Sequence, residues 1–237
     1  MDDALIGYLF DDKAHILTAP LSQWIGESRR FETFATTYRD KIRKKIRITR
    51  SSAGIKDLAA ELEIANWLLQ EKRFTLDYEP YNSQGTRGPD FAVSFKSNTF
   101  NVEVTRIHDS PSDSPSTPDA YQTANRLADT VCDKLGQMRP SMINTLTIVA
   151  DNAFLQAIEL DQAMAHLRER AERKDPNFFQ RYRFGNTAGF FKYFLRLSAL
   201  LLRPTSRQDS PPPSVLWLNN QAKHPLSGSL QTILQRL

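Results

Sequence analysis

Two acidic residues, Asp90 and Glu103, interrupt a stretch that otherwise reads as a β-hairpin, GPDFAVSFKSNTFNVEVT over residues 88–105. Apolar and polar residues alternate on both sides of a Lys-Ser-Asn-Thr centre, which is typical of two strands joined by a tight turn. Burying both apolar rows on one face places both acids on the other face. A turn centred on residues 97–98 pairs Asp90 with Thr105 and leaves Glu103 one diagonal step away. We therefore expect the two carboxylates to be neighbours.

Neighbouring carboxylates favour a bound cation, because two adjacent negative charges resist simultaneous ionisation. Hard oxygen donors suit Mg²⁺ or Mn²⁺, and Mg²⁺ keeps water ligands while it binds one or two carboxylates and a substrate phosphate. Such an ion generates hydroxide near neutral pH and polarises a phosphoryl oxygen. The alternative is a pair of ordinary exposed strand acids, with Glu103 balanced by Arg106 or a lysine. Because acids are depleted in strands, we favour the metal site.

Apolar periodicity around the hairpin predicts the elements that position these acids. A stripe at 3.6-residue spacing indicates a helix over residues 55–69, preceded by Ser and Gly start signals. A strand at 74–80 follows, then the hairpin, then a helix that opens at 117–119 and ends before Pro140, then a buried strand at 146–150. This order predicts an α/β fold with a mixed central sheet flanked by helices.

The two ends of the chain are expected to add helices to this core. Residues 1–50 form an N-terminal extension with little pattern before Phe31, after which a helix runs into the basic cluster RDKIRKKIRITR. Ser- and Pro-rich loops are expected at 109–119 and 204–213. Downstream of the core, the expected elements are a helical insert at about 152–203 with helices at 154–174 and 187–202, a strand at 215–218 and a closing helix at 229–237.

Composition excludes several kinds of site and partner. One cysteine, Cys132, allows neither an intramolecular disulfide nor a Cys-rich zinc site, and we expect it to pack as a small hydrophobe. The four histidines lack metal-ligand spacing, and neither a phosphate-binding glycine loop nor a G-x-S-x-G elbow occurs. No apolar run is long enough to span a bilayer and the N-terminus does not read as a secretory signal. We therefore expect a cytoplasmic protein with no membrane partner.

The balance of charge mildly favours a nucleic-acid partner. Lys and Arg total 31 against 27 acids, a formal net charge of +4. In the basic cluster at 39–50, Lys44 and Lys45 are candidate phosphate contacts, whose binding would release counterions. The alternative is a solvated helix face, as most charge runs are.

Residues 55–150 resemble the core of the PD-(D/E)xK nuclease superfamily. Its members carry an aspartate at the start of the second core strand and Glu-x-Lys on the third; Pro89-Asp90 matches the first motif and Glu103-Val104-Thr105 matches part of the second. The resemblance implies a restriction-endonuclease-like domain over 51–237, with a C-terminal strand and helix at 214–237, that cleaves nucleic acid with Mg²⁺ or Mn²⁺ held by Asp90 and Glu103. It favours DNA over RNA, with a role in restriction or defence. Because many such enzymes dimerise, a homodimer stays an open alternative.

The resemblance breaks at Thr105, which stands where the family has its lysine and cannot supply a positive charge. We expect Lys134 to replace that lysine, since Thr130, Lys134 and Gln137 form a stripe beside the apolar face of their helix. Gln137 would then assist with phosphate or water. The alternative is that Lys134 is a solvated helix residue and the site is degenerate.

Three further residues complete the expected site. The family adds an acid from the first helix; Glu61 lies at the margin of the buried stripe whereas Glu63 points nearly opposite, so we assign Glu61 as the third metal ligand. Arg87 and Arg106 stand next to the two motif segments and would grip phosphates on either side of the cut. Each of the three has an alternative as a plain surface charge.

Two other functions stay open. A chain that kept the fold but lost the lysine would be a non-catalytic nucleic-acid-binding module, with salt-sensitive binding and no metal-dependent cleavage. A protein-interaction subunit of a larger complex would use the Phe-rich helices around residues 178–194 as its partner surface. The aromatic residues there alternate with basic ones and can stack unpaired bases, but at helical spacing we expect them in the core.

Overall fold

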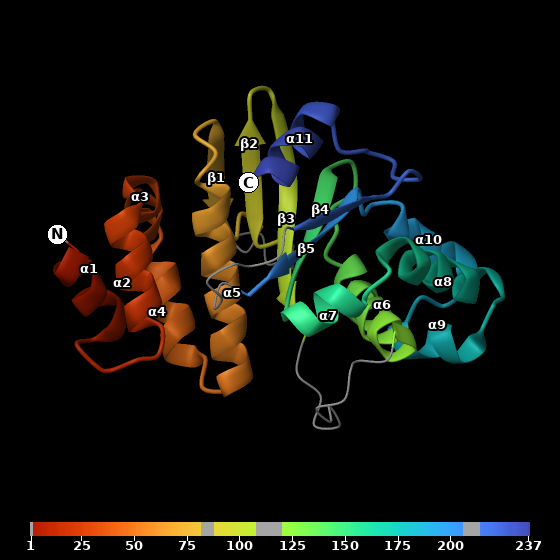
Figure 1. The fold of residues 1–237 in the computed structure, drawn as a ribbon, viewed down its shortest axis with the longest axis horizontal. Coiled ribbons are helices and arrows are strands. Elements are labelled where there is room, and N and C mark those ends of the chain that lie inside the picture. The colour runs from red at the N-terminus through yellow and green to blue at the C-terminus, as the bar shows by residue number, and fades with distance from the viewer. Residues whose placement is uncertain (1, 82–87, 108–119, 206–213) are drawn as a thin grey trace.

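The computed structural model describes residues 2–81, 88–107, 120–205 and 214–237 (Figure 1). Five helices come first and three strands follow: α1 (Asp2–Phe10), α2 (Thr18–Glu27), α3 (Arg29–Thr37), α4 (Arg39–Ile48), α5 (Ser52–Leu68), β1 (Phe74–Tyr78), β2 (Phe91–Phe95) and β3 (Asn98–Arg106). The rest of the chain forms α6 (Ala120–Leu135), β4 (Ile143–Ala150), α7 (Asn152–Ala157), α8 (Leu160–Glu172), α9 (Pro176–Tyr182), α10 (Thr187–Phe194), β5 (Ala199–Pro204), β6 (Val215–Leu218) and α11 (Gly228–Arg236). Within these ranges, no helix combines the length and the apolar character needed to cross a bilayer.

The strands of the described residues form one six-stranded mixed sheet whose spatial order follows the chain order, β1-β2-β3-β4-β5-β6. β1, β2 and β3 pair antiparallel, β3, β4 and β5 pair parallel, and β6 returns antiparallel to β5. The predicted α/β class and mixed, helix-flanked sheet are confirmed. The succession helix, three strands, helix, strand also occurs, as α5, β1, β2, β3, α6 and β4.

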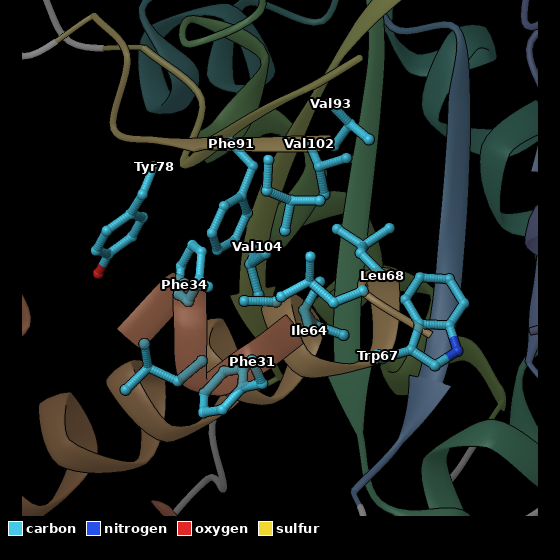
Figure 2. Packing of buried hydrophobic residues seen from close by; sticks show 14 of the residues in the cluster. Phe31, Phe34, Ile64, Trp67, Leu68, Tyr78, Phe91, Val93, Val102 and Val104 are labelled. Atoms are coloured by element: carbon cyan, nitrogen blue, oxygen red, sulfur yellow. The ribbon is translucent and has the colours of Figure 1, made fainter. Parts of the chain in front are cut away.

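Helices cover both faces of the sheet, and each face has its own hydrophobic core. Helices α1–α5 and α11 pack on one face, where Phe31, Trp67, Phe91 and Val102 belong to one buried cluster (Figure 2). Helices α6–α10 pack on the other face, against β4 side chains such as Leu146. Alternation along the strands produces this division, since successive side chains point to opposite faces. The N-terminal helices therefore share a core with the sheet.

The Phe-rich helices lie inside the second core. Their buried side chains are Phe178, Phe179, Phe184, Phe190 and Phe194. The expectation that this aromatic stretch is core is confirmed, and these five rings are not available as a partner surface. Cys132 is buried in the same cluster as a free thiol, as expected.

The hairpin register differs from the prediction by two residues. The turn spans residues 96–97 rather than 97–98, and its first residue takes the left-handed conformation (φ 54°) that closes so short a turn. A shift of two keeps every apolar side chain on its predicted face, because side chains alternate with period two. The same register, extended one step beyond β2, sets Glu103 rather than Thr105 across from Asp90.

Three helical predictions are corrected by the structure. The residues before Phe31, where little regularity was expected, form α1 and α2. The helix predicted at 187–202 is wrong in its second half, because α10 ends at Phe194 and the Ala-Leu-Leu-Leu run forms β5; a short, fully buried apolar run reads alike for helix and strand. The single helix expected at 154–174 is two helices, α7 and α8, separated by extended backbone at 158–159.

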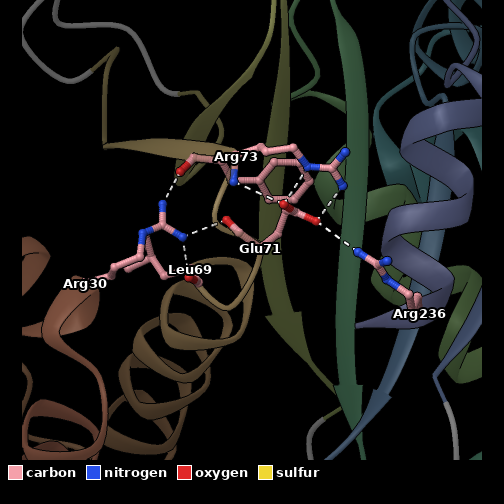
Figure 3. A network of polar contacts seen from close by, with 6 residues as sticks. Arg30, Leu69, Glu71, Arg73 and Arg236 are labelled. Atoms are coloured by element: carbon pink, nitrogen blue, oxygen red, sulfur yellow. Dashed lines mark hydrogen bonds and ion pairs between the residues drawn. The ribbon is translucent and has the colours of Figure 1, made fainter.

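A polar network joins three distant segments beside the sheet (Figure 3). Glu71, in the turn between α5 and β1, is 6% exposed and accepts hydrogen bonds from Arg73 at 2.7 and 2.8 Å and from Arg236 of α11 at 3.2 Å. The guanidinium of Arg30 on α3 donates to three carbonyl groups around the end of α5, including that of Glu71 at 2.6 Å. The bond to the carbonyl of Leu69, the residue directly after α5, satisfies an acceptor that has no partner within the helix.

Candidate active site

Asp90 lies at the start of β2, beside the ends of β1 and β3. Its Oδ2 accepts a hydrogen bond from the Val104 amide at 2.8 Å, and its carbonyl accepts one from the Glu79 amide at 2.7 Å. These bonds fix Asp90 against both neighbouring strands. Burial, followed by the charges of Glu61 and Glu103, raises the pKa of the Asp90 carboxyl well above its ordinary value of 3.8. Asp90 therefore lies within electrostatic range of both of the other predicted acids, Glu61 and Glu103.

Glu103 is the buried acid of β3, only 1% exposed. Its Oε1 accepts a hydrogen bond from Lys134 Nζ at 2.7 Å. Lys134 comes from the last turn of α6 and is 21% exposed, so its ammonium group is shielded but not sealed from solvent. A lysine charge thus stands beside Glu103 although Thr105 supplies none.

A second lysine reaches the site from α4. Lys45 Nζ lies 2.6 Å from Glu61 Oε1 and 2.7 Å from Glu79 Oε1, and 4.9 Å from the centroid of the Tyr78 ring. Burial opposes the charge of Lys45, but Glu61 and Glu79 outweigh burial and raise the pKa of Lys45 above 10.5. Lys45 was predicted as a surface contact to phosphate; in the structure it is a half-buried partner of two carboxylates.

The phenol of Tyr78, the last residue of β1, is a further polar group of this region. Tyr78 is 1% exposed, and its hydroxyl has no hydrogen-bond partner among the residues described. Figure 2 shows this hydroxyl pointing away from the Phe91 ring that stacks on Tyr78. Burial and the charge of Glu61 raise the pKa of the phenol well above 10.0, so it stays protonated and can donate a hydrogen bond.

The site has an excess of acid over base. Its carboxyl groups and ammonium groups, within the described chain, belong to Glu61, Glu79, Asp90 and Glu103 and to Lys45 and Lys134. Hard carboxylate donors suit Mg²⁺ or Mn²⁺ with its water ligands. However, no group of three His, Cys, Asp or Glu side chains in the described ranges is arranged as a complete set of metal ligands. The type of donor and the excess of negative charge therefore suit a divalent cation. In the structure, however, three of the four acids already form ion pairs with the two lysines.

Three other predicted residues stand next to this cluster or on its helices. Thr105 is partly buried on β3 and pairs with Ile148 of β4. Gln137 lies just past α6 and is buried, and its Nε2 has no hydrogen-bond partner in the described structure. Lys44 is exposed on α4, which leaves it free to meet a phosphate.

The two predicted arginines contribute less. Arg106 donates from Nε to Asp57 Oδ1 of α5 at 3.0 Å and is 11% exposed, so an acid already engages it. Arg87 lies outside the described residues. The grip on phosphates assigned to these two residues therefore stays a prediction.

Sequence reasoning missed Glu79 and Tyr78, which both lie at the end of β1. The stretch FTLDYEP reads as a short strand, and its alternation predicts only that Tyr78 faces the core. One local signal was present, a Glu-Pro pair directly after a strand, which favours a turn. No pattern within the sequence pairs Glu79 with Lys45, because that contact joins two elements whose packing is not encoded locally.

No protein-family model matches this chain, and no curated protein or solved structure matches it either. Its function is therefore inferred from its residues and their geometry. Asp90 before β2, Glu103 on β3 and Lys134 on α6 are the residues from which that inference starts.

Proposed function

We propose that this chain is a nuclease of the PD-(D/E)xK kind, which cleaves phosphodiester bonds with Mg²⁺ or Mn²⁺. The observation that carries the proposal is the Lys134 ammonium group at 2.7 Å from Glu103, an acid whose charge helps to raise the pKa of Asp90. Two strand carboxylates and a lysine are the charged groups that such a reaction uses. The contact supports Lys134 as the substitute for the lysine missing at Thr105.

Asp90, Glu103 and Glu61 would hold the divalent cation. When bound, the cation would acidify a water molecule and offset negative charge on the phosphate. Lys134 would hold Glu103 in place and stabilise charge that develops on the phosphate oxygens. The protonated phenol of Tyr78 would donate a hydrogen bond to a water molecule or to the substrate.

We infer a nucleic acid as the substrate, with DNA favoured over RNA. The family resemblance supports this, together with the net charge of +4 and exposed cations on α4 such as Arg39 and Lys44. A cytoplasmic role in restriction or defence belongs to the same proposal. So does action as a homodimer that cuts both strands.

Cleavage assays test the proposal. Purified protein would be incubated with supercoiled plasmid, linear duplex, single-stranded DNA and RNA in Mg²⁺, Mn²⁺ or EDTA, beside Glu103→Ala and Lys134→Ala. We expect metal-dependent cutting by the wild type and none by either variant. Cutting lost only in Glu103→Ala would keep the nuclease and remove Lys134 from its mechanism. Absence of cutting in every metal would overturn the proposal.

The second candidate is a nucleic-acid-binding module that has lost catalysis. It is favoured by the two lysines, which already neutralise Glu61 and Glu103, and by the incomplete set of metal ligands among the described residues. Such a module would bind DNA with strong salt dependence and cut it in no metal. Its binding would stay unchanged or strengthen in Glu103→Ala, because an acid near the phosphates is removed.

A further inference from the structure

Helix α4 brings a positive charge into the carboxylate site from outside the strand-helix core. Lys45 Nζ contacts Glu61 at 2.6 Å and Glu79 at 2.7 Å, and the three side chains are only 23%, 12% and 17% exposed. Exposed ion pairs contribute little to stability, but breaking a shielded pair leaves an uncompensated charge inside the protein. The contact is therefore more than a surface salt bridge.

The same face of α4 holds the end of β1 at a second point. Lys41, one helical turn before Lys45, donates to the Tyr78 carbonyl at 2.7 Å. Lys44, between them in the sequence, is exposed. Two lysines at i and i+4 thus attach α4 to consecutive residues at the end of β1.

Glu79 is held in an unusual backbone conformation at this attachment. Its φ of 48° lies in the left-handed region, which is unfavourable for a residue other than glycine. The hydrogen bond from its amide to the Asp90 carbonyl and the ion pair of its side chain with Lys45 compensate for this cost. Glu79 therefore links the candidate metal ligand Asp90 to α4.

We propose that Lys45 is the resident cation of the Glu61 and Glu79 half of the site, that it competes with a divalent metal ion for Glu61, and that α4 is thereby a positioning element of the active site. The inference rests on the proposed function. Removing the charge of Lys45 leaves four carboxyl groups with one ammonium group, so the site attracts a divalent cation more strongly. Lys45 is a positioning residue, and its loss also loosens α4 from β1.

The test is a titration of the full chain with Mn²⁺ by calorimetry, paired with thermal unfolding in EDTA. The variants are Lys45→Met, Lys45→Arg, Glu79→Gln and, as a matched control on the same helix, Lys44→Met. Lys45→Met should bind Mn²⁺ at least about fivefold more tightly, because a unit charge near the ion is removed. Its Tm in EDTA should fall by about 4 °C or more, and Mn²⁺ should restore most of that loss.

The other variants separate charge from folding. Lys44→Met and Lys45→Arg should keep the wild-type affinity for Mn²⁺. Glu79→Gln should bind Mn²⁺ more weakly, because it removes one acid and leaves Glu61 as the sole carboxylate partner of Lys45. If Lys45→Met does not fold, the Glu79→Gln variant provides the test.

Two outcomes overturn the inference and can be told apart. In the first outcome, the wild type binds Mn²⁺ and Asp90→Asn does not, but Lys45→Met binds no more tightly and Glu79→Gln no more weakly than the wild type. This outcome would overturn only the role of Lys45. Absence of Mn²⁺ binding by the wild type would overturn the proposed metal-dependent function and this inference with it.

Discussion

Two polar networks in this chain are built in opposite ways. Around Glu71, arginines from separate segments converge on one carboxylate and its neighbouring carbonyl groups (Figure 3). The hydrogen bonds of Arg73 outweigh burial and lower the pKa of Glu71 to about 2. This acid is fully compensated by cations.

Around Asp90 the balance is reversed. Four carboxyl groups share two lysines, and burial together with the charges of Glu61 and Glu103 raises the pKa of Asp90. A compensated acid adds stability and needs no ligand, whereas acids in excess cost stability and are typical of sites where a ligand supplies the missing charge. This difference in charge balance identifies the Glu71 network as structural and the cluster around Asp90 as the candidate active site.

The largest effect is expected at the lysine of the acid-rich site. Lys134→Met should lower the rate of metal-dependent cleavage roughly 10²–10³-fold, because a preorganised positive charge beside Glu103 is lost. Lys134→Arg keeps the charge and should retain more activity than the methionine variant. Single-turnover cleavage of labelled duplex measures both rates. A methionine variant that cuts at the wild-type rate would remove Lys134 from the site.

At the compensated site the expected effect is on stability. Glu71→Gln removes charged hydrogen bonds to Arg73 and Arg236 and should lower the free energy of unfolding by about 1.5–3 kcal/mol. Urea unfolding measures this difference. The control is Glu172→Gln, at an exposed helix position, which should change stability by less than about 0.5 kcal/mol. Equal effects in the two variants would show that the Glu71 network is ordinary surface charge.

The same network predicts a pH dependence with a defined sign. The pKa of Glu71 falls from an ordinary 4.5 to about 2 on folding, so its contribution to stability is present above pH 4.5 and is lost as the pH falls toward 2. The stability gap between wild type and Glu71→Gln should therefore be constant near neutral pH and shrink below 4.5. Unfolding curves across this range check the prediction, and a gap independent of pH would contradict it.

The smallest effect is expected at Asp90, with the opposite sign. Its pKa is raised on folding, so ionised Asp90 lowers stability above pH 3.8, and the cost grows as the pH rises. Without metal, Asp90→Asn should raise the Tm by a few degrees near neutral pH, and the gain should vanish in acid. Asparagine keeps an oxygen for the Val104 amide. A lower Tm for this variant in EDTA would show that Asp90 is a structural acid.

Local pattern predicted the parts of the site that lie on regular elements. The apolar stripe and the Ser51 cap, which accepts from the Gly54 amide at 3.1 Å, define α5 and hence the face of Glu61. Helical spacing likewise placed Lys134 beside the apolar face of α6. The hairpin was found but its turn was misplaced by one residue, because several polar residues there can each close a turn.

The contacts between different elements could not be predicted from the sequence. Lys45 lies in a run of basic residues, where its neighbour Lys44 is solvated, and composition alone cannot tell the two apart. Its burial depends on how α4 crosses α5 and the end of β1, which side-chain packing over many residues decides. β5 was mistaken for helix for a related reason, since a fully buried strand has no alternation to reveal it.

The most direct test compares two buried glutamates in one assay. Glu103→Gln and Glu71→Gln would be tested for nicking of supercoiled plasmid in Mg²⁺ and Mn²⁺, at a temperature where both are folded by circular dichroism. The acid-rich site predicts that Glu103→Gln loses at least about 10²-fold in rate while Glu71→Gln cuts like the wild type. Equal cutting by Glu103→Gln and the wild type would contradict the assignment of the carboxylate site as the place where the chemistry occurs.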